Sequence, residues 1–431
     1  MLANSNDTVG RTRQPGAPRP ATGLGGRPHH HTDLRGSTEL APFPGPLAPV
    51  IRPPLKDEMP VGAPLRPARV SAGRDLRLDT LRGFMLVAIA INHLNTELRV
   101  FTDYPFGFVS TAEGFVFLSG LVAGLVYTRQ SDRLSPAELN QKAQRRAWQI
   151  YLAHLCSFVA AFVGLRLLAH FAHIETYTAP AMFFQHPVTA LLMGPLLLFQ
   201  PGLLDILPMY CGFMLALPMI LAALRNGRWG RLFAASSGLW LLSQFGLLDF
   251  VERWFQRFLP VNMGVFDPLA WQFLFVSGAF IGFHWAKAGK PLFAFRPAML
   301  AFCLLVATPL WFLLKYQHVP TGLSMDMVWS WADKQHLAPL RLANFIVLAY
   351  LIAAVAVHRP RFLTFRPFAF LGRHSLVVFT AQATLCIFVL TQTQLFATFT
   401  GRTVTALAMV GFLFLVAWLS EMWTKRRQRA S

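Results

Sequence analysis

Charged residues are scarce in this chain of 431 residues: Asp, Glu, Lys and Arg make up 14% of it, against about 25% in soluble domains. Acidic residues are the scarcest, 20 against 39 Lys and Arg, while apolar types reach 54%. This composition excludes an ordinary soluble protein. The net charge of +19 would suit nucleic-acid binding, but the basic residues form short clusters between long apolar runs. That layout is typical of a multi-pass membrane protein, so we expect a lipid bilayer and no nucleic acid as partner.

Cysteine is also rare. The four cysteines lie inside or beside apolar runs, and no CxxC or Cys/His metal spacing is present; they are Cys156, Cys211, Cys303 and Cys386. A disulfide framework and a zinc site are therefore not expected, and the cysteines are interpreted as small apolar residues. We predict no metal cofactor.

Residues 1–72 lack long apolar runs and hold 13 of the 30 prolines, with many Gly and Arg. Such a segment buries too little apolar surface to offset the entropy lost on ordering. We predict a disordered, Pro/Arg-rich cytoplasmic tail. It has no apolar core of a signal peptide. Its short tract His29–His31 is interpreted as solvated tail rather than a metal site.

From residue 78 onward, apolar stretches follow one another at the length of membrane spans, roughly 17–25 residues. We predict an all-α, polytopic integral membrane protein with about ten transmembrane helices. They lie near 83–98, 114–128, 148–169, 206–224, 232–248, 270–286, 298–314, 340–357, 371–390 and 403–423. Segment 179–199 is an eleventh candidate, as a span or a re-entrant segment.

The loop charges predict that both termini are cytoplasmic. With ten helices and the N-terminus inside, Lys and Arg gather in the inner loops and in the basic C-terminal tail 426–431. The outer loops carry few of them, as the positive-inside rule requires. An eleventh span at 179–199 would invert every later loop and destroy this asymmetry.

The first predicted helix carries polar groups at membrane depth. Arg82 and His93 are eleven residues apart, about 16 Å and three turns, and so share one face. Asp79, one turn before Arg82, can hold its guanidinium. An arginine at the rim suits phosphate or carboxylate, and a histidine at mid-depth suits taking a proton from an alcohol. The alternative is an arginine anchored among lipid headgroups and a histidine that forms structural hydrogen bonds between helices.

Three further features lie in or near the second and third predicted helices. Glu113 begins the second predicted helix at the expected depth of His93, where a carboxylate can orient the imidazole; a helix-start acid is the structural alternative. Gly120 and Gly124 form a GxxxG pattern that favours close helix packing. Ser135 and Glu138 have the form of a capping box.

Later polar positions are less distinctive. Asp205, Asp267 and Trp271 open two predicted helices on the outer face, and carboxylates with aromatic rings are a common sugar-binding combination. An interfacial aromatic belt explains the same aromatic residues. Arg373 opens the ninth predicted helix on the inner face, where it can meet a donor phosphate or simply follow the positive-inside rule.

Four segments together resemble the OpgC branch of the membrane-bound acyltransferase type 3 superfamily. The spacing Arg82-x10-His93 is supported by the segments Leu78–Gly83, Glu113–Gly120, Asp205–Tyr210 and Phe370–Leu376. The resemblance covers residues 73–425. It implies a bacterial inner-membrane enzyme that adds succinyl groups to periplasmic glucans, with an acyl-CoA donor, His93 as base and Arg82 at the donor site.

We therefore expect a multi-pass O-acyltransferase that moves an acyl group, succinyl in the family, from cytoplasmic acyl-CoA to hydroxyls of a periplasmic glucan. Glu113 would steady His93, and Arg82, Arg373 and Asp79 would form the donor site. Asp205, Asp267 and Trp271 would contact the glucan, and glucan-synthesis proteins are possible partners. The alternatives are a transporter or flippase for a glycan or lipid-linked sugar, with His93 and Glu113 as proton relay, and a non-catalytic membrane partner of glucan-synthesis enzymes.

Overall fold

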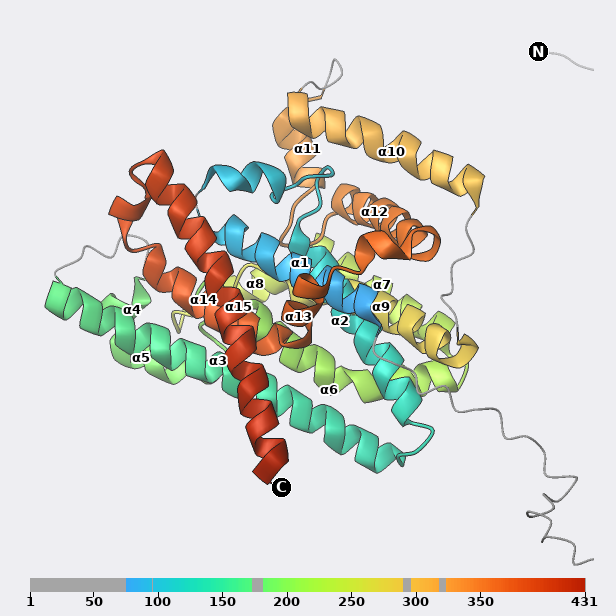
Figure 1. Cartoon of the computed structure of the whole chain (residues 1–431), viewed down its shortest axis with the longest axis horizontal. Helices are drawn as coiled ribbons and strands as arrows, with labels where there is room; N and C mark the ends of the chain where they lie inside the picture. Colours follow the sequence, from blue (N-terminus) through green and yellow to red (C-terminus); the bar gives the residue numbers. More distant parts are fainter. Residues whose placement is uncertain (1–74, 95, 173–180, 290–295, 318–322, 431) are drawn as a thin grey trace, which may run out of the picture. The chain divides into compact units, whose positions relative to one another are not determined.

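The computed structural model of the protein describes residues 75–94, 96–172, 181–289, 296–317 and 323–430. Within these ranges the chain is helical, and the β pairing is limited to an isolated bridge between Phe199 and Asn262. The predicted all-α class is thus confirmed for this part of the chain (Figure 1). The predicted tail, residues 1–72, lies outside the described residues.

Each predicted apolar stretch overlaps a described helix, and the stretch 371–390 is divided between two helices. In chain order they are α1 Leu76–His93, η1 Glu97–Phe101, α2 Thr111–Gln130, α3 Pro136–Ala172, α4 Met182–Gln185, α5 Pro187–Met193, α6 Ile206–Arg225, α7 Trp229–Gln244, α8 Leu247–Phe255, α9 Pro268–Ala288, α10 Pro297–Tyr316, α11 Met325–Trp331, α12 Pro339–His358, η2 Pro360–Leu363, α13 Arg366–Arg373, α14 Ser375–Val389, η3 Thr393–Phe396 and α15 Phe399–Ala430.

Fewer helices qualify as candidate membrane spans than the ten that were predicted. Among the described residues, seven helices are long and apolar enough to cross a membrane: α2, α3, α6, α9, α10, α12 and α15. The pair α13 and α14, bent by 85°, makes an eighth if it counts as one span. The two remaining predicted spans are α1, whose polar residues lower its hydropathy, and α7, which has only 16 residues. Ten spans and the cytoplasmic termini stay predictions.

Segment 179–199 does not form a long helix where it is described. It contains α4 and α5, of four and seven residues, which are too short to span. Phe183, Phe199 and Phe158 of α3 pack edge to face, with ring centroids 5.5–6.3 Å apart. The segment is thus attached to α3 through aromatic contacts.

Side-chain caps define several helix starts. Ser135 and Glu138 form the predicted capping box before α3, with the backbone N–H of Ser135 donating to Glu138 Oε2 at 2.7 Å. A second capping box, not foreseen, joins Ser110 and Glu113 at the start of α2. These caps satisfy amide donors that have no acceptor inside the helix.

Helices α2 and α9 pack with their backbones in direct contact. A Cβ on Gly120 would overlap the carbonyl oxygen of Phe275, and one on Gly124 that of Ala279. Gly278 of α9 meets α2 in the same way. The GxxxG prediction is confirmed, and the reciprocal glycine pattern on α9 completes the interface, because small residues let helix backbones approach closely.

Helix α1 packs equally closely on α13. A Cβ on Gly83 would overlap the carbonyl oxygen of Phe368, and one on Gly372 that of Asp79. The chain then turns by 85° at His374 before α14 begins at Ser375. This break places the start of α14 beside α1.

Replacing Gly120 by Ala is expected to destabilise the protein by about 1–3 kcal/mol, because the added methyl group displaces the backbone of α9. Thermal unfolding of the detergent-purified protein measures the change. Gly212→Ala on α6 is the matched control: its Cβ would meet nothing within 4 Å, so its melting temperature should stay the same or rise. Equal melting temperatures for wild type and Gly120→Ala would contradict the packing described.

Candidate active site

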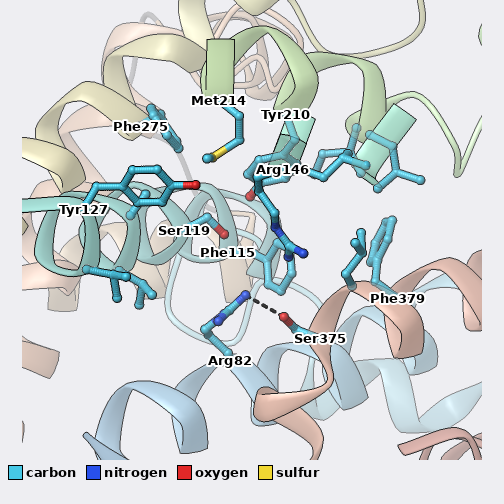
Figure 2. A pocket seen from close by; sticks show the side chains of 17 residues that line it. Arg82, Phe115, Ser119, Tyr127, Arg146, Tyr210, Met214, Phe275, Ser375 and Phe379 are labelled. Atoms are coloured by element: carbon cyan, nitrogen blue, oxygen red, sulfur yellow. Dashed lines mark hydrogen bonds between the residues drawn. The ribbon is translucent and has the colours of Figure 1, made fainter. Parts of the chain in front are cut away.

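A cavity of about 210 Å³ lies among side chains of α1, α2, α3, α6, α9 and α14 (Figure 2). Its polar lining consists of two guanidinium groups, two serine hydroxyls and two phenols, from Arg82, Arg146, Ser119, Ser375, Tyr127 and Tyr210. The other lining residues are apolar, Phe115, Met214, Phe275 and Phe379 among them. A mainly apolar cavity with a few converging polar groups is the usual form of a ligand site.

Arg82 lies on one wall of this cavity. Its guanidinium donates a hydrogen bond to the hydroxyl of Ser375, with Nη2 and Oγ 2.5 Å apart. Ser375 reaches it because the bend after α13 makes this serine the first residue of α14. The predicted donor-site arginine thus lines a cavity, and it acquires a partner 293 residues further along the chain.

His93 is the last residue of α1. It shares one continuous helix with Arg82, as predicted, so the two side chains begin about 16 Å apart along the axis. Nδ1 of His93 is buried and has no hydrogen-bond partner among the described residues. Buried polar atoms nearly always have partners, so this nitrogen is available to a ligand hydroxyl.

The helix ends at His93, earlier than the end of the predicted span 83–98. Asn92 instead fastens the following segment, since its Oδ1 accepts a hydrogen bond from the hydroxyl of Thr102 at 2.5 Å. Glu97 lies in η1 and accepts a hydrogen bond from Nε of Arg402 at 2.6 Å. That bond holds the pKa of the Glu97 carboxyl below its usual value. Asn95 lies outside the described residues.

The carboxylate of Glu113 has partners other than the expected His93. One oxygen, Oε2, accepts hydrogen bonds from the backbone N–H and hydroxyl of Ser110, at 3.0 and 2.6 Å. The other, Oε1, accepts from Nη1 of Arg341 at 2.8 Å. The side chains of Glu113 and Arg341 are 0% and 1% exposed. Within the described residues, no hydrogen bond joins Glu113 to His93.

Arg341 was not foreseen as a site residue. It lies in the first turn of α12, and its Nε donates to the carbonyl oxygen of Ala332 at 2.7 Å. Its guanidinium also lies over the ring of Tyr104, 5.4 Å from the centroid. One turn on, Asn344 Oδ1 accepts from the backbone N–H of Phe108 at 2.7 Å. The available signal was an arginine at the edge of a long apolar stretch, which must be paired if it is buried.

Arg146 is the second basic residue of the cavity. In the sequence it belongs to a basic cluster with Lys142 and Arg145. Those two side chains are exposed, but Arg146 is half-buried and lines the cavity. Successive residues of a helix point about 100° apart, so neighbours in one basic cluster have different surroundings.

Two predicted donor-site residues do not line the cavity. Arg373 ends α13 with an exposed side chain that stacks on Phe370, 5.5 Å from the ring centroid. Asp79 is buried in the first turn of α1, where its backbone carbonyl touches Gly372. The cavity lining thus includes Arg82 alone of the three predicted donor-site residues.

The three predicted glucan contacts are buried, with local partners. Asp205 is 4% exposed, and its Oδ2 accepts from the backbone N–H of Val265 at 2.8 Å. Asp267 caps α9 through Leu269 N–H at 2.7 Å and also accepts from the hydroxyl of Ser243 at 2.5 Å. Trp271 is fully buried, and its indole N–H donates to the Gln335 carbonyl oxygen at 3.0 Å. These contacts give all three residues a structural role in this conformation.

Metal ligands do not cluster in the part of the chain that the structure describes: no group of three or more His, Cys, Asp or Glu side chains could hold a metal ion. The four cysteines are free thiols, and Cys211, Cys303 and Cys386 are buried. Their burial agrees with the predicted packing role.

The Glu113–Arg341 ion pair can be tested by a double-mutant cycle. Glu113→Gln should cost about 3–5 kcal/mol of stability, because it leaves a buried guanidinium uncompensated. Glu113→Gln combined with Arg341→Met should cost less than the sum of the two single changes. Chemical denaturation in detergent measures all four proteins. Asp132→Asn, in an exposed pair with Lys287, is the control and should change little. Strict additivity would show that the two side chains do not interact.

Comparison with known proteins gives one result. No curated protein and no solved structure matches the chain. A protein-family model described as "OpgC protein" matches residues 74–426. This match covers most of the chain and includes α1 with Arg82 and His93, α2 with Glu113, and the bent pair α13–α14. The chain therefore belongs to the OpgC family.

Proposed function

We propose that this protein is a membrane O-acyltransferase that moves a succinyl group from acyl-CoA to hydroxyls of a periplasmic glucan. The observation that carries the proposal is the arrangement on α1 of an OpgC-family chain. Arg82, in the second turn of this helix, lines a cavity, and His93, whose Nδ1 has no partner among the described residues, ends the helix. Such a helix can connect an anionic donor to a hydroxyl acceptor across the distance between its ends.

The donor would enter from the cytoplasm and place phosphate near Arg82, whose guanidinium suits bidentate binding of phosphate oxygens. Ser375 supports this role, because its hydrogen bond fixes the orientation of the guanidinium. The long pantetheine arm would then extend along α1. Its thioester would reach the neighbourhood of His93, about 16 Å away along the helix.

At His93 the imidazole would remove the proton of a glucan hydroxyl as the oxygen attacks the thioester carbonyl carbon. A C–O ester bond forms, the C–S bond breaks, and the thiolate leaves and takes up a proton. General-base catalysis of this kind requires an imidazole nitrogen within hydrogen-bond reach of the hydroxyl. The unpartnered Nδ1 supports that assignment.

Glu113 would act at a distance rather than on the imidazole. Its ion pair with Arg341 ties the start of α2 to the start of α12, and its capping box fixes the segment that follows α1. In this proposal Glu113 and Arg341 are positioning residues for His93. The protein would act in the bacterial inner membrane, where a cytoplasmic donor and a periplasmic acceptor are accessible from opposite sides.

The first experiment compares glucans from a strain that lacks this protein and is complemented with wild type, His93→Ala or His170→Ala. Anion-exchange separation and mass spectrometry detect the acyl increment. We expect wild type and His170→Ala to restore a succinyl increment, because His170 is an exposed residue of α3. His93→Ala should reduce it by about a hundredfold or more, since a general base contributes 10²–10⁴ in rate.

Equal membrane expression of the variants is the necessary control. If wild type restores the amount of periplasmic glucan without an acyl increment, the protein is a transporter and the proposal fails. Full acylation of the glucan by the His93→Ala variant would show that His93 is not the catalytic base. The mass of the increment identifies the acyl group, so an increment other than succinyl would correct the donor.

A further inference from the structure

The cavity lined by Arg82 contains a second guanidinium, which belongs to Arg146. The two residues come from α1 and α3, and their guanidinium groups point into the cavity from opposite walls (Figure 2). The cavity lining contains no acidic residue. Two guanidinium groups thus face one mainly apolar space.

This arrangement favours an anion as the ligand. A charge in apolar surroundings is strongly disfavoured unless an opposite charge or several hydrogen bonds accompany it. The polar partner of Arg146 in the structure is the neutral amide oxygen of Gln149, 3.1 Å from Nη1. Arg341, by contrast, is fully buried with a carboxylate at 2.8 Å. The comparison indicates that the charge of Arg341 is neutralised by a protein carboxylate, whereas Arg146 faces a cavity that can hold a ligand.

The size of the cavity indicates which part of a ligand it receives. At about 210 Å³ it is smaller than the roughly 300–1,000 Å³ of pockets that enclose a whole small molecule. It therefore suits one group of a larger donor. The hydroxyls of Ser119 and Tyr210 add donors around the same space. Phosphate, with several acceptor oxygens, matches two guanidinium forks and surrounding hydroxyls better than a single carboxylate does.

We propose that Arg146 and Arg82 together bind a phosphate group of the acyl donor, and that Arg146 is a donor-binding residue. This inference rests on the proposed function, because it assumes a phosphorylated donor. It adds to that function a residue of α3, which no motif of the sequence marked. The donor would be held between two helices, and the site would recognise its phosphate rather than its acyl group.

Binding measurements in phosphatidylcholine nanodiscs test this assignment without depending on turnover. The probes are coenzyme A and pantetheine, which share the thiol arm; coenzyme A adds the pyrophosphate and the phosphorylated adenosine. Wild type should bind coenzyme A at least tenfold more tightly than pantetheine. Arg146→Gln should weaken coenzyme A binding by roughly tenfold to a hundredfold, the range for a lost hydrogen bond to a charged group. Its binding of pantetheine should not change.

Two variants serve as controls. Arg145→Gln removes the neighbouring charge, whose side chain is exposed, and should bind coenzyme A like wild type. Arg146→Lys keeps the charge without the planar fork and should show intermediate affinity. It also decides the question if Arg146→Gln fails to fold, which thermal unfolding in the same nanodiscs reveals.

Several outcomes overturn the assignment. If Arg146→Gln binds coenzyme A as tightly as wild type does, Arg146 does not contact the phosphate. If its affinities for coenzyme A and pantetheine fall equally, Arg146 has a purely structural role. If Arg146→Gln binds coenzyme A like wild type but no longer prefers succinyl-CoA, Arg146 binds the carboxylate of the acyl group instead. If phosphatidylglycerol in the nanodiscs abolishes coenzyme A binding to wild type, a lipid phosphate occupies the site.

The experiment also separates this inference from the proposed function. If wild type binds neither coenzyme A nor succinyl-CoA, the donor of the proposed function is wrong and Arg146 has no donor to bind. If wild type binds them and Arg146→Gln does so equally, the acyltransferase proposal stands and only the role of Arg146 fails.

Discussion

The placement of guanidinium groups in apolar surroundings governs this structure. Arg341 is 1% exposed and is satisfied within the protein by the Glu113 carboxylate, the Ala332 carbonyl oxygen and the face of Tyr104. Because a buried charge requires such partners, this one residue ties together α2, α12 and the segment that follows α1. Arg82 and Arg146 line a cavity. The same chemical group thus joins helices at one place and lines a cavity at another.

Close backbone packing gives these charges their positions. Glycines let α2 lie directly on α9, so Ser119 and Tyr127 of α2 line the same cavity as Phe275 of α9. Glycines also let α1 lie on α13, and the bend after α13 brings Ser375 to Arg82. In lipid, where helices gain little from hydrophobic burial against each other, such contacts carry much of the association between helices. The geometry of the cavity therefore depends on residues that have no side chain.

The two ends of α1 have distinct chemistry within one rigid element. One end meets a basic cavity, and the other carries an imidazole beside a polar network that includes the Asn92–Thr102 pair. In the proposed function, a single helix sets the separation between donor recognition and proton transfer, so this distance cannot change without breaking α1. This arrangement suits a reaction whose two substrates approach from opposite sides of a membrane.

The sequence by itself determined the helical class, the positions of the long helices, the GxxxG contact and the common helix of Arg82 and His93. These features follow from local periodicity and from spacing along one element. Only the tertiary structure decided which side chains meet. Glu113 pairs with Arg341, 228 residues away. The side chain of Arg146 lines the cavity. Asp205, Asp267 and Trp271 are buried and hydrogen-bonded to neighbouring residues. Contacts between distant elements depend on how helices cross and bend, and a helical pattern holds no information about its partner's rotation or register.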